Sequence, residues 1–134
     1  FRPVDEQSLG RFRELFAASF GVQVDDAYFR WKYVDNPAGN VIAYEALHAD
    51  RPAAFYGVIP EVWTVNGVAR TVYQSMDTAT HPSYQRRGLF VKLAQLTYQA
   101  LAEKGDTTIL GFPSGQSYPG FVNKLGWKHI NDID

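Results

Sequence analysis

The fold of this chain is decided by the stretch from His81 to Leu93, which reads HPSYQRRGLFVKL. A β-strand pattern runs into it, a turn containing proline follows, and a helical apolar pattern begins at its end. Backbone N–H groups at a helix start, together with the helix dipole, favour a bound anion. Gly88 lets the backbone approach an anion without a Cβ in the way, and Arg86 and Arg87 add positive charge. The stretch therefore predicts a pyrophosphate-binding turn between a strand and a helix.

On either side of this turn, the pattern predicts a hairpin, the helix and one further strand. Asn66-Gly67 between two β-rich runs favours a two-residue type I′ turn. The predicted elements are strands Glu61–Val65 and Val68–Thr80, a helix Gly88–Lys104 with Gly105 as its cap, and a strand Thr107–Phe112. The helix makes a crossover connection, so the strands before and after it are expected to be parallel neighbours.

The two ends of the chain complete the order of elements. At the N-terminal end we expect a helix that is capped by Asp5 and ends at Gly21, and then a short helix from Asp25 or Asp26. A turn at Asn36-Pro37-Ala38-Gly39 should follow. After it we expect the strands Val41–Leu47 and Ala53–Ile59, the second of which is interrupted by Pro60. At the C-terminal end we expect a helix Ser117–Leu125, ended by Gly126, and a last strand over Trp127–Ile130. This order predicts an α+β fold, a mixed and mostly antiparallel sheet flanked by helices. A Rossmann fold is excluded, because the turn lacks G-x-G-x-x-G and antiparallel strands precede it.

Composition limits the classes of function. The chain has 134 residues, which is one domain's worth, so we expect a single domain over 1–134. A net charge of −1 argues against a general nucleic-acid binder, and the absence of Cys excludes thiolate metal sites and cysteine nucleophiles. The three histidines are far apart and show no ligand spacing, so no metal is expected. No apolar run is long enough for a membrane span, and the expected location is the cytoplasm.

The motifs carry a resemblance to a known family. Gln85-Arg86-Arg87-Gly88-Leu89-Phe90 is similar to the [Q/R]-x-x-G-x-[G/A] motif of the GNAT superfamily, with Phe90 in place of a small residue. Phe121–Trp127 is similar to the family's signature near its last helix, and Trp31-Lys32-Tyr33 with Asn36–Gly39 is similar to a segment of some bacterial members. The resemblance implies a V-shaped splay between two central parallel strands. The family usually has strands after Trp127, so the C-terminal part is expected to be truncated, or completed by a further segment or by a second copy in a homodimer.

The resemblance also implies a cosubstrate, acetyl-CoA, and the residues that bind it. The pyrophosphate is expected on the turn formed by Gln85, Arg86, Arg87, Gly88, Leu89 and Phe90, which Phe90 makes more crowded. The pantetheine arm is expected to lie in the splay, along the main chain of Thr78, Ala79 and Thr80, like an added strand. A backbone N–H there would polarise the thioester carbonyl.

Candidates for the proton transfers follow from position. Asp77 lies one residue before the expected slot and is our candidate base for an amine that is mostly protonated at neutral pH. Glu45 and Glu61 are competing bases. In many family members a Tyr protonates the departing thiolate, and this chain has Val122 at that position. Tyr118 is the candidate to replace it as the acid. A thiolate is a good leaving group, so it leaves without much help from an acid.

The leading hypothesis is transfer of an acetyl group from acetyl-CoA to a primary amine by direct attack in a ternary complex. The acceptor is expected to be a small molecule or a peptide. A second hypothesis is a non-catalytic acyl-CoA-binding or regulatory domain of a larger protein. A third is transfer of a longer acyl or an aminoacyl group.

Overall fold

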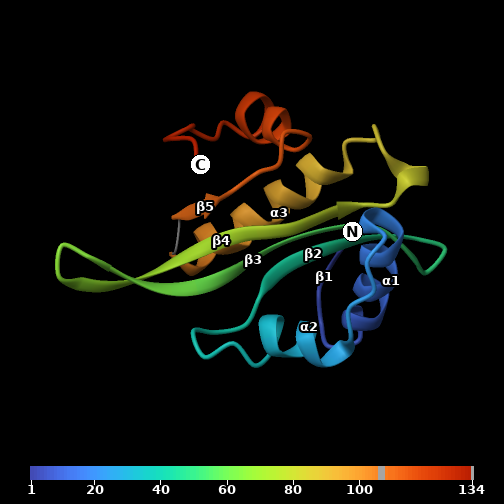
Figure 1. Cartoon of the computed structure of the whole chain (residues 1–134), viewed down its shortest axis with the longest axis horizontal. Helices are drawn as coiled ribbons and strands as arrows, with labels where there is room; N and C mark the ends of the chain where they lie inside the picture. Colours follow the sequence, from blue (N-terminus) through green and yellow to red (C-terminus); the bar gives the residue numbers. More distant parts are fainter. Residues whose placement is uncertain (106–107, 134) are drawn as a thin grey trace.

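The computed structural model describes residues 1–105 and 108–133, and these form a five-stranded sheet with helices on both faces (Figure 1). In chain order the elements are β1 Arg2–Pro3, α1 Ser8–Phe20, α2 Asp26–Tyr33, β2 Ile42–His48, β3 Arg51–Val65, β4 Val68–Thr80, the 3₁₀ turn η1 Pro82–Tyr84, α3 Leu89–Lys104, β5 Ile109–Gly111 and the π turn η2 Gly120–Lys124. The strand order is β1-β2-β3-β4-β5; β4 and β5 run parallel and the other neighbours antiparallel. The predicted fold class is confirmed.

The helix starts follow from capping side chains. Asp25 precedes α2 and its carboxylate accepts a hydrogen bond from the Tyr28 N–H at 2.9 Å. Asp5 accepts one from the Ser8 N–H at 3.1 Å, at the start of α1. Each bond satisfies a backbone donor that has no partner inside the helix. The predicted start of α2 is confirmed. The helix α1 begins at Ser8, after Gln7, three residues beyond the predicted cap Asp5, and Gly21 ends it with φ of 68°.

The β3–β4 hairpin is the long ribbon that projects from the body in Figure 1. Its turn has positive φ at Asn66 and Gly67, as a type I′ turn requires. The predicted break at Pro60 is wrong, because β3 continues through it and pairs Pro60 with Tyr73. The Pro60 carbonyl accepts a hydrogen bond from the Asn36 amide on the side away from β4. Pairing with β2 has already ended at Val58, so the missing N–H of Pro60 removes no ladder bond.

The C-terminal part differs most from the sequence expectation. The strand β5 is shorter than predicted, and Thr107 lies outside the described residues. Trp127–Ile130 forms no strand: the Trp127 ring packs against Phe121 at a centroid distance of 4.6 Å, and its indole N–H donates to the Tyr98 hydroxyl at 2.9 Å. These contacts hold the segment over α3 instead of at the sheet edge. The short strand β1 was not predicted.

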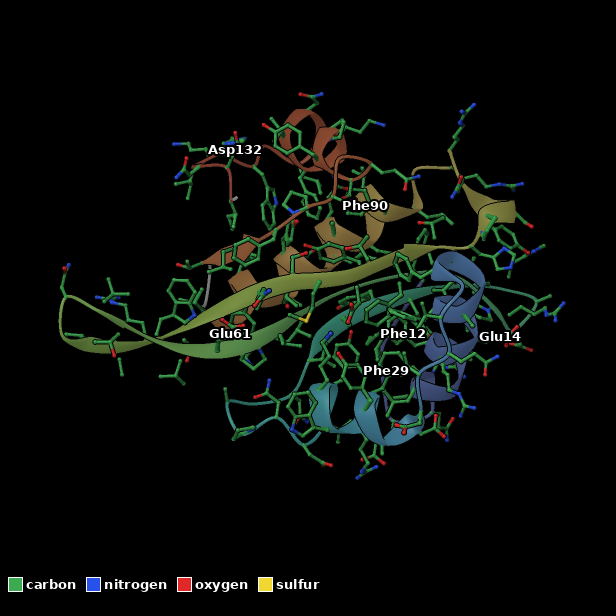
Figure 2. All side chains as sticks on the ribbon, viewed as in Figure 1. Phe12, Glu14, Phe29, Glu61, Phe90 and Asp132 are labelled. Atoms are coloured by element: carbon green, nitrogen blue, oxygen red, sulfur yellow. The ribbon has the colours of Figure 1, made fainter. Side chains whose placement is uncertain are left out.

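Each face of the sheet has its own apolar core. The cluster under α1 and α2 contains Phe12, Leu15, Phe29, Tyr33, Ala43, Phe55, Ile59 and Ala79, and the cluster under α3 contains Ala46, Ala53, Ala54, Tyr56, Val58, Tyr73, Leu93, Ala94, Leu101 and Phe121. Figure 2 shows Phe12 and Phe29 on one side of the sheet and Phe90 on the other. None of the described helices is long and apolar enough to cross a bilayer.

Candidate active site

The central feature of the site is the point at which β4 and β5 part. They pair at Tyr73↔Ile109, Gln74↔Leu110 and Ser75↔Gly111. The chain leaves β5 after Gly111, whereas β4 continues to Thr80. The two central parallel strands therefore diverge toward their C-terminal ends, and the predicted V-shaped splay is confirmed.

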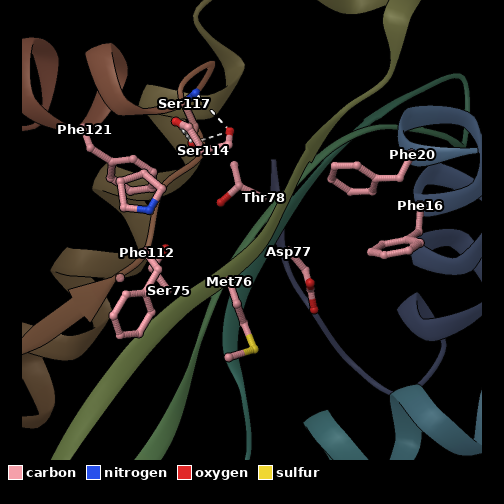
Figure 3. A pocket seen from close by; sticks show the side chains of 12 residues that line it. Phe16, Phe20, Ser75, Met76, Asp77, Thr78, Phe112, Ser114, Ser117 and Phe121 are labelled. Atoms are coloured by element: carbon pink, nitrogen blue, oxygen red, sulfur yellow. Dashed lines mark hydrogen bonds between the residues drawn. The ribbon is translucent and has the colours of Figure 1, made fainter. Parts of the chain in front are cut away.

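A cavity of about 280 Å³ lies in this splay (Figure 3). Its walls come from α1, from β4 and from the segment that follows β5. The lining residues are Phe16, Phe20, Ser75, Met76, Asp77, Thr78, Gly111, Phe112, Pro113, Ser114, Ser117 and Phe121. Figure 3 shows Asp77 on the side of the strand that faces α1 and α2. Most of its wall is apolar, and serine and threonine hydroxyl groups occur at several points of it.

A β-bulge in β4 sets the direction of the side chains in the cavity. The register shifts between Phe55↔Ala79 and Gly57↔Met76, so β4 has one extra residue there. Asp77 has φ of 55°, a left-handed conformation that Asp tolerates better than most residues. Met76 and Ala79 both pack against the α1/α2 core, although residues three apart in a regular strand point to opposite faces. The bulge therefore keeps Met76, Asp77 and Ala79 on one side.

The Asp77 carboxylate is held by α2. Its Oδ2 accepts hydrogen bonds from Lys32 Nζ at 2.5 Å and from the Tyr33 hydroxyl. Burial, and secondly the charge of Asp77, raise the pKa of Tyr33 well above its ordinary value, so Tyr33 stays a proton donor to this carboxylate. Asp77 thus lies at the cavity wall already paired with an ammonium group.

The open edge of β4 presents main-chain groups to the splay. The His81 N–H donates to the Ala53 carbonyl at 2.8 Å, which makes Ala54↔Thr80 a non-hydrogen-bonded pair. The N–H and C=O of Thr80 therefore point away from β3, toward the splay, where the carbonyl accepts a hydrogen bond from the Ser19 hydroxyl at 3.3 Å. Thr78 lines the cavity, whereas the Ala79 side chain is buried in the α1/α2 core.

The predicted anion turn is exposed and lies at the start of α3. Gln85, Arg86, Arg87 and Gly88 are all exposed. Arg86 has φ of 61° and Gly88 has φ of 72°, and α3 begins at Leu89 without a capping side chain. The first N–H groups of a helix have no partner inside it, so those of α3 are left for a ligand. Left-handed residues among such N–H groups are typical of anion-binding concavities.

Phe90 does not crowd this turn. Its ring is half-buried and packs against Phe121 at 5.0 Å and Tyr56 at 5.8 Å between centroids. A Cβ at Gly120 would lie 2.6 Å from the Phe90 ring, so the glycine makes room for it. The expected crowding is wrong, because the large side chain points into the core under α3.

The other candidate residues have different surroundings. Tyr118 is not among the cavity-lining residues; its hydroxyl lies 2.8 Å from His129 Nδ1. Glu45 is buried and paired with Arg11 at 2.6 Å, on β2. Glu61 lies in the projecting hairpin, where it accepts a hydrogen bond from the Trp63 indole. The geometry therefore brings Asp77 to the cavity and leaves these three elsewhere.

The sequence reading missed several residues of the site. Lys32 belongs to a segment that the sequence marks only as a motif, without a chemical role for the lysine. Ser75, Ser114 and Ser117 line the cavity with hydroxyl groups, and serines in a strand end and a loop carried no signal of their own. Among the described residues no group of side chains could hold a metal ion.

Comparisons with known proteins agree with this geometry. Among curated protein sequences, none matches this chain significantly. A solved acetyltransferase from Trypanosoma brucei is 21% identical over 99% of this chain and 95% of that one, with a TM-score of 0.73. AAC(6′)-Iy in complex with the bisubstrate analogue CoA-S-monomethyl-acetylneamine is 17% identical over 99% and 92%, with a TM-score of 0.77. A predicted acetyltransferase from Clostridium acetobutylicum, solved with acetyl-CoA, is 15% identical over 98% and 91%, with a TM-score of 0.73.

At these identities the solved structures show a shared fold. The family assignment comes from the sequence profile described as "Acetyltransferase (GNAT) domain", which matches residues 1–130. The match covers the divergent strands, the cavity and the turn before α3. The chain therefore belongs to the GNAT acetyltransferase family.

Proposed function

We propose that this protein transfers an acetyl group from acetyl-CoA to a primary amine in a ternary complex. The observation that carries the proposal is the cavity in the β4–β5 splay. The strand β4, which lines it, leads along the chain to the exposed turn with Arg86 and Arg87 before α3. A solved neighbour with acetyl-CoA bound and another with a CoA-linked aminosugar analogue support the cosubstrate and a small-molecule amine acceptor.

In this proposal each part of the site has one task. The turn from Gln85 to Phe90 binds the pyrophosphate, and the main chain from Thr78 to Thr80 pairs with the pantetheine arm. Asp77 takes a proton from the substrate ammonium, directly or through water. The amine nitrogen then bonds to the thioester carbon, the C–S bond breaks, and its electron pair leaves on sulfur. The nitrogen loses its second proton to water as the intermediate collapses, so the products are an amide and the thiolate of CoA.

The experiment compares two glycines at the two ends of α3. Gly88 and Gly105 both have positive φ, 72° and 87°, and a Cβ at either position meets open space. Gly88→Ala and Gly105→Ala should therefore cost similar folding stability, about 1–2 kcal/mol of backbone strain. Only Gly88→Ala should weaken acetyl-CoA binding in calorimetry, because a distorted turn no longer presents its N–H groups. Equal affinity in the two variants would remove the pyrophosphate assignment.

The main alternative is a non-catalytic acyl-CoA-binding domain of a larger protein. Two observations favour it: Val122 stands where many family members have a Tyr, and Asp77 already has an ion-pair partner. Turnover of acetyl-CoA with a panel of amines separates the hypotheses. Aminosugars, small alkylamines and lysine peptides form the first panel. Binding of acetyl-CoA without any amide product across that panel would favour the regulatory domain.

A further inference from the structure

Ser75 is a buried hydroxyl at the apex of the splay with no hydrogen bond. It is 7% exposed, it forms the last pair of β4 with β5, opposite Gly111, and it lines the cavity. Among the residues that the structure describes, Ser75 Oγ is the only buried side-chain oxygen or nitrogen that has no hydrogen-bond partner. Buried polar groups are almost always paired, so an unpaired one in the wall of a ligand cavity indicates a ligand atom as its partner.

The neighbours of Ser75 form a buried network of two phenol hydroxyls and an indole N–H. The Trp127 indole N–H, which can only donate, bonds to the Tyr98 oxygen at 2.9 Å, and the Tyr98 and Tyr56 oxygens are 2.9 Å apart. Either of the two phenols can donate in that pair. The Tyr56 hydroxyl lies close to Ser75 Oγ, but the two groups complete no hydrogen bond. Burial raises the pKa of both phenols, so both keep their protons.

The length of a pantetheine arm decides which ligand atom reaches Ser75. From the pyrophosphate oxygen to sulfur the arm has about a dozen bonds, the length of about four extended residues or roughly 13 Å. Met76 lies four positions before Thr80 in β4. If the pyrophosphate end of the arm lies beside Thr80, where β4 runs into the anion turn, the sulfur reaches Met76, next to Ser75.

We propose that the Ser75 hydroxyl donates the hydrogen bond that stabilises the departing CoA thiolate, an inference that rests on the proposed function. As the C–S bond breaks, the electron pair moves to sulfur and Ser75 holds it by a charge-assisted hydrogen bond. Ser75 keeps its proton, because a thiol of pKa about 8.5 is far more acidic than an alcohol. Water protonates the thiolate after release. Ser75 would thus stabilise the departing thiolate, the role that a Tyr has in many family members and that Val122 cannot fill here.

The test measures binding of CoA and of S-methyl-CoA, which has no ionisable sulfur, by calorimetry between pH 7 and pH 9.5. In wild type, CoA should gain affinity over S-methyl-CoA as pH rises. Ser75→Ala should lose about tenfold in CoA affinity at pH 9.5 and nothing for S-methyl-CoA. The S-methyl-CoA reference cancels titration of the ionisable groups around the cavity, Asp77, Lys32, Tyr33, Tyr56 and Tyr98. Ser75→Thr keeps the hydroxyl and should keep most of the gain.

Tyr98→Phe gives a second readout that leaves Ser75 intact. It removes the hydroxyl that links Trp127 to Tyr56, so it should lose part of the gain at high pH. Wild-type CoA affinity at pH 9.5 in Ser75→Ala would overturn the inference, and so would an equal loss for both ligands, which indicates a packing role. A change in acyl-chain preference without the pH effect would place Ser75 against the acyl group and overturn it too. If neither ligand binds wild type, the acyl-CoA assignment itself fails.

Discussion

Breaking the ion pair between Lys32 and Asp77 separates a catalytic role of Asp77 from a structural one. The Nζ–Oδ2 distance is 2.5 Å, and the two side chains are 14% and 20% exposed. Removing one partner of a fully buried pair costs about 3–5 kcal/mol. Because some solvent reaches this pair, we expect about 2 kcal/mol for each of Lys32→Met and Asp77→Asn. The double variant should recover about 1–2 kcal/mol of the sum, since neither charge is then left alone. Urea denaturation of the four proteins measures this coupling.

Measuring acetyltransferase activity in the same four proteins tests whether Asp77 accepts the proton of the substrate amine. If Asp77 accepts the proton, Asp77→Asn should lower kcat by about 10²–10⁴-fold with little change in acetyl-CoA affinity. Lys32→Met leaves the Asp77 carboxylate in place, so this variant should keep most of the wild-type kcat. The comparison uses whichever amine the wild-type protein acetylates. Equal losses in kcat for the two single variants would refute this reasoning and indicate that the pair only shapes the cavity. An unchanged kcat in Asp77→Asn would assign proton removal to water.

Three further predictions concern the turn, the core and the tyrosines. Arg86→Ala with Arg87→Ala should weaken acetyl-CoA binding by about tenfold at low salt and less at 0.5 M salt, because exposed charges are screened; an unchanged salt dependence of calorimetric affinity would contradict it. Phe12→Ala should lower the free energy of unfolding by about 3–5 kcal/mol, because Phe12 is 2% exposed and its ring centroid lies 4.1 Å from that of Phe55. A loss below about 1 kcal/mol in denaturant titration would contradict this prediction. The raised pKa values of Tyr33, Tyr56 and Tyr98 mean that the folded state keeps protons that the unfolded state loses above about pH 10. Stability should therefore be constant with respect to these groups below pH 10 and fall above it, and Tyr33→Phe should reduce the slope.

Local chemistry made much of the fold predictable. Asp25 needs only the N–H of Tyr28 to start α2, and Asn66-Gly67 needs only its own φ angles to turn the chain. The errors arose where the outcome depends on distant residues. Pro60 is tolerated because β2 stops pairing at Val58, which is a fact about another strand. Trp127 leaves the sheet because its indole finds the Tyr98 hydroxyl, 29 residues away.

The candidate site divides in the same way. The anion turn is one contiguous segment, so its residues could be named from the sequence. Asp77 was named from its position before the slot, but its partner Lys32 is 45 positions away, and the order of the chain gives no sign of that contact. Ser75 differs from any other strand serine only in lacking a hydrogen bond at the apex of the splay, which is a property of the assembled sheet.

The bulge at Asp77 explains why these features occur at one place. The last β4–β5 pair is Ser75↔Gly111, and the extra residue of β4 falls directly after it. A bulge increases local twist and bends the strand, so it turns β4 away from β5 where the cavity begins. The same extra residue turns Asp77 to the side of α2, where regular alternation would have turned it toward α3. Asp and Asn both tolerate a positive φ, so Asp77→Asn removes the charge and keeps the bulge. A branched residue such as Val would strain the bulge, so loss of activity in Asp77→Val would say nothing about proton transfer.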